Sequence, residues 1–177
     1  MGVPAAERDT LDRASDLGIA FQLANIARDI VDDAKVGRVY LPADWLADER
    51  LTGADLTDPR HCPALASLTR RLADLAERYR RSSKVGAARL PFRSRWAVLS
   101  AAGIYGEVAT RAVSLGPRAW DRRISISKAE KFALVIEAFG EALMPAPKVS
   151  REGLWTRALS VSGAVAAAPP RSSRVPL

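Results

Sequence analysis

The sequence has few residues that could form disulfides or structural zinc sites. Its 177 residues include one cysteine, Cys62, and one histidine, His61. A single cysteine excludes a disulfide within the chain, and structural zinc sites typically need four cysteine or histidine ligands. Hydrophobic residues (48%) and charged residues (27%) are present in the proportions of folded proteins, which excludes a wholly disordered chain.

Long hydrophobic runs are also absent. The longest uncharged runs, residues 96–106 and 158–170, fall short of the roughly 18 residues that a membrane-spanning helix needs. The first residues show no basic segment followed by an apolar one, so no secretory signal is visible. We therefore expect a cytoplasmic protein, with peripheral attachment to a membrane as an alternative.

Positive charge is in excess, but it is unevenly placed. The net charge is +7, from 27 basic and 20 acidic residues, and more than half of this excess lies in residues 145–177. The nearly neutral body does not interleave basic with aromatic residues, so we expect no nucleic-acid partner. A basic helical module that binds nucleic acid or a membrane surface is the least favoured interpretation.

Helical periodicity dominates the sequence, and no alternating strand pattern is found. Helices are expected over residues 10–34, 63–83, 92–115 and 128–143, the last with a capping box from Ser127 to Glu130. The sequence thus predicts an all-α domain over residues 1–144. Proline, serine and alanine with scattered arginine predict a mobile tail over residues 145–177.

The first of these helices carries a polar stripe on an otherwise apolar surface. At 100° per residue, the stripe covers an arc of about 80°. It consists of Gly18, Gln22, Asn25, Asp29 and Asp33. Because the rest of the helix is apolar, we expect other helices around it, with the stripe facing a cavity or the solvent edge.

The stripe has the chemistry of a magnesium site. Asp29 and Asp33 are four residues apart, so their carboxylates project side by side and repel unless a cation lies between them. Mg²⁺ prefers such oxygen ligands and completes its shell with water and phosphates, and Asn25 could add an amide oxygen. Two structural alternatives stay open: acids that are merely solvated, and an ion pair between Asp32 and Arg28.

Several segments closely resemble the squalene/phytoene synthase family. They are residues 12–18 (DRASDLG), 25–33 (NIARDIVDD) and 37–42 (GRVYLP), which are similar to the second aspartate-rich motif of that family. Residues 120–123 (WDRR) and 127–131 (SKAEK) are similar to the C-terminal part of bacterial phytoene synthases. The resemblance covers about residues 1–144.

The resemblance implies the C-terminal part of an isoprenoid-synthase-type helical bundle. The implied activity is a prenyltransferase of carotenoid biosynthesis, which condenses two geranylgeranyl diphosphates head-to-head into phytoene. It implies Mg²⁺, or alternatively Mn²⁺, as the cofactor and a prenyl diphosphate as the substrate. The implied roles are as follows: catalysis by Asp29 and Asp33, metal binding by Asn25, Asp29 and Asp33, and substrate binding by Gln22, Arg28 and Tyr105.

The sequence departs from the family pattern in one respect, because the first aspartate-rich motif is absent. Asp12 and Asp16 share the spacing, but they lie in the polar approach to the helix. We therefore expect an incomplete enzyme that corresponds to the C-terminal half of a phytoene synthase. The alternatives are a squalene-type synthase of the same class and a non-catalytic helical fragment or interaction module, which would self-associate through its exposed cavity wall.

Overall fold

The protein is all-helical in a computed structural model that describes residues 8–155. The helices are α1 (Arg8–Lys35), α2 (Ala43–Asp48), α3 (Cys62–Ala87), α4 (Phe92–Leu115) and α5 (Lys128–Leu143), with short 3-10 turns at Gly53–Thr57, Pro59–His61 and Gly116–Arg118. The described residues contain no strand. The all-α prediction is confirmed, and the four long helices lie where their periodicity predicted.

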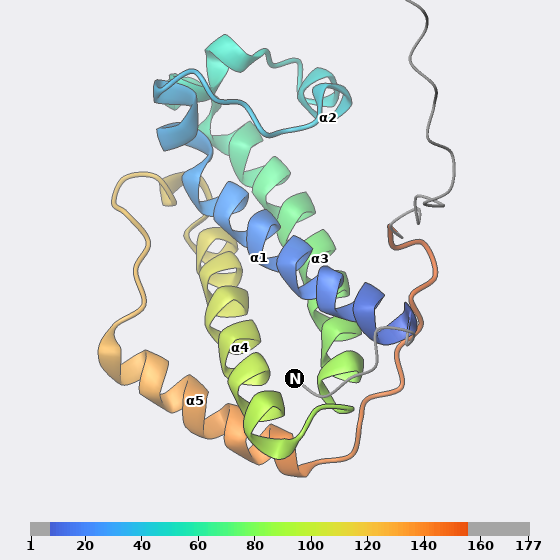
Figure 1. The fold of residues 1–177 in the computed structure, drawn as a ribbon. Helices are drawn as coiled ribbons and strands as arrows, with labels where there is room; N and C mark the ends of the chain where they lie inside the picture. Colours follow the sequence, from blue (N-terminus) through green and yellow to red (C-terminus); the bar gives the residue numbers. More distant parts are fainter. Residues whose placement is uncertain (1–7, 156–177) are drawn as a thin grey trace, which may run out of the picture.

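The long helices form a bundle around α1 and α3 (Figure 1). These two helices pack along much of their length, α4 packs against both, and α5 packs against α4. At one end of the bundle, α2 and the turns after it close over a hydrophobic cluster. The cluster combines Ala27 and Ile30 of α1 with leucines of α2 and α3, including Leu46, Leu65 and Leu68.

One helix capping prediction can be checked directly. The hydroxyl of Ser127 accepts a hydrogen bond from the backbone N–H of Glu130, and the Glu130 carboxylate accepts one from the backbone N–H of Ser127. This capping box satisfies two backbone donors that the first turn of a helix otherwise leaves free. It confirms the start of α5 that the sequence indicated.

The helices α1 and α3 approach each other closely at Gly86. A Cβ atom at this position would lie 2.7 Å from the Cβ of Arg13, which is closer than such atoms come in real structures. We expect Gly86→Ala to lower the free energy of unfolding by roughly 1–3 kcal/mol, because the two helices must move apart. Chemical denaturation measures this loss.

Gly103 provides the matched control, because it lies within α4 and no atom would meet its Cβ within 4 Å. Gly103→Ala should raise stability by up to about 1 kcal/mol, since alanine favours the helix more than glycine does. A Gly86→Ala protein as stable as the Gly103→Ala protein would contradict the close approach of α1 and α3.

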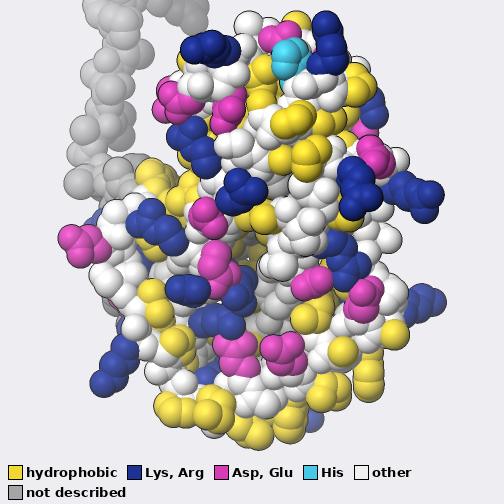
Figure 2. Space-filling model, turned by 180° about the vertical axis from the view of Figure 1, so that it is seen from behind, with side chains coloured by type: hydrophobic (Ala, Val, Ile, Leu, Met, Phe, Trp, Pro, Cys, Tyr) yellow, Lys and Arg dark blue, Asp and Glu magenta, His cyan; other side chains and the backbone are white. Residues whose placement is uncertain are grey.

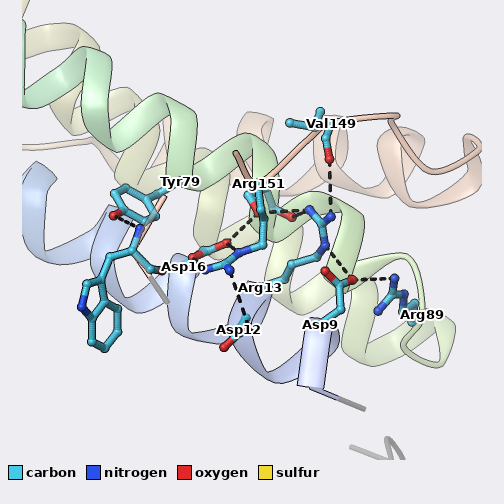
Figure 3. A network of polar contacts seen from close by, with 10 residues as sticks. Asp9, Asp12, Arg13, Asp16, Tyr79, Arg89, Val149 and Arg151 are labelled. Atoms are coloured by element: carbon cyan, nitrogen blue, oxygen red, sulfur yellow. Dashed lines mark hydrogen bonds and ion pairs between the residues drawn. The ribbon is translucent and has the colours of Figure 1, made fainter. Parts of the chain in front are cut away.

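The segment after α5 runs back to α1 and α3, where a buried acid binds it (Figure 3). The Asp16 side chain is fully buried, and its two oxygens accept hydrogen bonds from Nε and Nη2 of Arg151, both at 2.7 Å. The Ser82 hydroxyl of α3 donates to the same carboxylate at 2.6 Å. Asp16 is therefore a buried structural anchor within α1, and not part of a polar approach that precedes the helix.

Two further contacts hold the same segment. Arg13 donates from Nη2 to the carbonyl oxygen of Val149, and the backbone N–H of Trp155 donates to the Tyr79 hydroxyl at 3.1 Å. Val149, Arg151 and Trp155, which lie in the segment expected as the start of a mobile tail, thus make polar contacts to α1 and α3. Residues 156–177 lie outside the described residues, and for them a mobile tail stays a prediction.

Within residues 8–155, no helix is both long and apolar enough to cross a membrane.

Candidate functional site

The second half of α1 presents the polar stripe on the side opposite its buried edge. The buried edge consists of Ala20, Ala24, Ala27 and Ile30, which follow one another at helical spacing. At 100° per residue this edge faces nearly opposite to the stripe. The residues of the stripe are accordingly half-buried (Asn25, Asp29, Asp33) or exposed (Gly18, Gln22).

The described helices cover α1 on one side only, which differs from the expectation that other helices surround it. Leu17, Leu23 and Val31 are only partly buried. Among residues 8–155, α3 and α4 are the long helices that pack against α1, and both do so from its buried side. The stripe therefore lies on a side of α1 that no other long helix of the described residues covers.

Arg28 binds Asp29 and not Asp32. Its Nε donates to Oδ1 of Asp29 at 2.7 Å and its Nη2 donates to Oδ2, so the contact has two hydrogen bonds. Asp32 instead accepts a hydrogen bond from Lys35 at 2.9 Å, and both of these side chains are largely exposed. The structural pair between Arg28 and Asp32 that the sequence left open does not form.

The Arg28 guanidinium lies among the acidic residues of the stripe. Its hydrogen bonds to Asp29 raise the pKa of Arg28 above its ordinary value, against the opposing effect of partial burial. The charges of Asp29, Tyr105 and Asp33 raise this pKa further. Arg28 thus lies close to three other residues implied by the resemblance, namely Asp29, Asp33 and Tyr105.

Tyr105 of α4 packs against α1 and lines a pocket. Its ring stacks on Phe21 of α1, with centroids 4.0 Å apart and an angle of 17° between the planes. Both rings line a pocket of about 460 Å³ between α1, α3 and α4. Alanines such as Ala24, Ala76 and Ala109 give the pocket an apolar wall, while Asp74, Glu77 and Arg80 of α3 add charged groups to its lining.

A loop between α4 and α5 closes over the acidic end of α1. Its residues Trp120, Arg122 and Arg123 line a small crevice together with Arg28 and Asp29. From the sequence, residues 120–123 of this loop were noted only for their similarity to bacterial phytoene synthases, and no role was predicted for them. The pair of adjacent arginines was the available signal, but the sequence does not show that the loop folds back onto α1.

The oxygen donors of the stripe fit part of a magnesium site. Asp29, Asp33 and Asn25 offer two carboxylates and an amide from one helix, and Mg²⁺ commonly takes one or two carboxylates and fills its shell with water and phosphates. Within the described part of the chain, no three acidic, histidine or cysteine residues lie close enough to hold a metal ion by themselves. A metal bound here would therefore need further donors, such as a diphosphate.

Comparisons with known proteins identify relatives over most of the chain. The family model for squalene/phytoene synthase matches residues 1–130. The chain is 48% identical over 162 residues to a 15-cis-phytoene synthase of Enterobacter agglomerans, covering 89% of this chain and 54% of the relative. It is 48% identical over 150 residues to a 15-cis-phytoene synthase of a Paracoccus strain, covering 83% of this chain and 48% of the relative.

A less similar relative also has the name of a phytoene synthase. A phytoene synthase of Rhodobacter capsulatus is 36% identical over 128 residues, which cover 72% of this chain and 38% of the relative. The chain spans about half the length of the two 15-cis-phytoene synthases it matches. From the match of the family model over residues 1–130, this chain belongs to the squalene/phytoene synthase family.

Proposed function

We propose that this chain carries the second aspartate-rich half of a phytoene synthase-type prenyltransferase. The proposed reaction joins two geranylgeranyl diphosphates head-to-head into phytoene. The observation that carries the proposal is the position of Asp29, bound by Arg28 and covered by the arginines of the loop at residues 119–124, next to an apolar pocket. The relatives named as phytoene synthases favour this product over a squalene-type one.

The proposed roles follow from charge and position. Asp29, Asp33 and Asn25 would hold Mg²⁺, which when bound neutralises diphosphate charge and makes it a better leaving group. Arg28, Arg122 and Arg123 provide guanidinium groups, which suit phosphate oxygens. Gln22 is exposed on the same face and would reach the substrate from the open edge.

The pocket next to Tyr105 suits the hydrocarbon part of the substrate. Its lining combines alanines with the stacked rings of Phe21 and Tyr105. An apolar wall of this kind excludes water, and an allylic carbocation would otherwise be captured by water. We therefore assign the prenyl chain to this pocket and the diphosphate to the arginines and aspartates beside it.

Binding of geranylgeranyl diphosphate to the full chain tests this proposal. Isothermal titration calorimetry should show binding with MgCl₂ present, little binding after chelation with EDTA, and little binding of geranylgeraniol, which lacks the diphosphate. Equal binding of the alcohol and the diphosphate, or binding that EDTA does not affect, would contradict the assigned site. The same titration with farnesyl diphosphate distinguishes a squalene-type substrate.

A non-catalytic helical module is the second candidate. It is favoured by the open side of α1, where apolar residues such as Leu23 and Val31 are only partly buried. Such a surface drives association with another chain. A chain that forms a stable complex with itself in light scattering and binds no prenyl diphosphate would support this candidate over the enzyme.

A further inference from the structure

The ion pair of Arg28 and Asp29 differs from the exposed pairs of this protein. Figure 2 shows acidic and basic side chains intermixed across one face of the molecule, and an exposed pair such as Arg71 with Asp48 adds little to stability. The side chains of Arg28 and Asp29, in contrast, are only 22% and 26% exposed. Because Asp29 belongs to the polar stripe, this contact affects any cation that binds there.

Arg28 occupies the carboxylate that a metal ion would use. Its Nε donates to Oδ1 of Asp29 at 2.7 Å and its Nη2 donates to Oδ2, so both oxygens are engaged. The positive charge of the guanidinium therefore opposes a cation that approaches the same oxygens. Within residues 8–155, the side chains of Asp33 and Asn25 form no hydrogen bond or ion pair. One free carboxylate and one amide thus remain for a metal ion that arrives alone.

The crevice beside this pair is too small for a diphosphate as it stands. Its volume is about 10 Å³, which is roughly the space of one water molecule. Residues of α1 and of the loop at residues 119–124 line it together. A diphosphate that enters the crevice must therefore displace a lining side chain, and Arg28 is the one that holds Asp29.

The charges around the crevice favour an incoming anion over a cation. Its charged lining consists of Arg28, Arg122, Arg123, Asp29 and Asp32. The guanidinium groups thus outnumber the carboxylates. A negatively charged group is attracted to this lining, whereas a metal ion without an accompanying anion is not.

Trp120 provides an independent sign that a hydrogen-bond acceptor belongs in this region. It lines the same crevice, and its indole N–H is buried without an acceptor among the described residues. Buried donors are nearly always paired in folded proteins, so an unpaired one calls for an explanation. An anion offers acceptor oxygens to such a donor, and a metal ion does not.

We propose that Arg28 excludes a metal ion from Asp29 until a diphosphate draws its guanidinium away, so that metal and diphosphate bind only together. Phosphate oxygens accept paired hydrogen bonds from a guanidinium as carboxylate oxygens do, so Arg28 can exchange one partner for the other. The exchange frees both oxygens of Asp29 for a metal ion. Each ligand then strengthens the binding of the other, because coupling between two binding events is reciprocal. This inference rests on the proposed function, since it concerns the regulation of the same site.

Binding of Mn²⁺ to the full chain without diphosphate tests the proposal, with free Mn²⁺ measured by electron paramagnetic resonance. The wild-type chain should bind Mn²⁺ weakly. Arg28→Gln should bind it roughly tenfold more tightly, because a positive charge beside a carboxylate opposes cation binding. Adding Asp29→Ala to Arg28→Gln should abolish this gain. In calorimetry with MgCl₂, Arg28→Gln should instead weaken the binding of geranylgeranyl diphosphate, since one guanidinium is lost.

Lys35→Gln is the matched control. It removes the same charge from α1, but Lys35 pairs with Asp32, and both side chains are largely exposed. It should therefore change the Mn²⁺ affinity far less than Arg28→Gln does. Circular dichroism verifies that each variant keeps its helices.

The proposal is overturned if Arg28→Gln binds Mn²⁺ no more tightly than the wild-type chain, or if Lys35→Gln tightens binding equally. A gain that persists in the double variant with Asp29→Ala would also overturn it, because the metal would then lie elsewhere. Failure of the proposed function has a different signature: the wild-type chain would not bind geranylgeranyl diphosphate in the presence of MgCl₂, whatever the Mn²⁺ affinity of Arg28→Gln.

Discussion

Replacing Asp16 by alanine is expected to lower the free energy of unfolding by about 3–5 kcal/mol, which is typical when one partner of a buried ion pair is removed. The Asp16 carboxylate is fully buried and accepts hydrogen bonds from Arg151 and Ser82. Its hydrogen bonds raise the pKa of Arg151, whose side chain is only 13% exposed. Without Asp16, the Arg151 charge would lose its main partner in a largely dry environment.

Denaturant unfolding followed by circular dichroism measures this loss, and Asp32→Ala is its control. Asp32 lies on the same helix, but its ion pair with Lys35 is largely exposed, so its removal should change stability by less than about 1 kcal/mol. Hydrogen exchange should also show lost protection near residues 149–155 in the Asp16→Ala protein alone. Equal stabilities of the two variants would contradict the structural role of Asp16.

Replacing Asp29 by alanine is expected to weaken Mg²⁺-dependent binding of geranylgeranyl diphosphate at least tenfold. Residues that only hydrogen-bond to a metal ligand already change metal affinity roughly 10–100-fold. Tenfold is therefore the smallest effect we expect from removing a residue that binds the metal itself. The change removes one of two adjacent carboxylates and also releases Arg28, which Asp29 holds with two hydrogen bonds. Calorimetry with MgCl₂ measures the change in Kd.

Asp32→Ala again serves as the control, because it removes the same charge three residues further along α1. Asp32 also lines the crevice beside Asp29, but its side chain is largely exposed and pairs with Lys35, so Asp32→Ala should change the Kd far less than Asp29→Ala does. If Asp32→Ala weakened binding as much as Asp29→Ala, the effect would come from net charge and not from ligation at Asp29.

The four long helices could be predicted from the sequence because their signals are local. Helical periodicity shows each apolar face, and caps such as the Ser127–Glu130 box fix where a helix begins. The family was also recognisable, because the spacing of Gln22, Asn25, Arg28, Asp29 and Asp33 is itself a local pattern on one helix. The confirmed fold class and family rest on these features.

Contacts between distant segments could not be predicted in the same way. Arg151 and Asp16 are 135 residues apart, and no local pattern indicates that they meet. The return of the loop at residues 119–124 to Arg28 and Asp29 depends on how α4 packs against α1. The choice of Asp29 over Asp32 as the partner of Arg28 depends on side-chain conformation, which helical spacing does not determine.

The central claim, that α1 binds a metal ion and a diphosphate at Asp29 and Asp33, is tested most directly with Mn²⁺ in place of Mg²⁺. Mn²⁺ broadens the NMR signals of nearby nuclei. With geranylgeranyl diphosphate present, we expect the amide signals of residues 25–33 and 120–123 to broaden, while those of α5 stay sharp. Broadening that is absent, or that occurs away from residues 25–33, would contradict the claim.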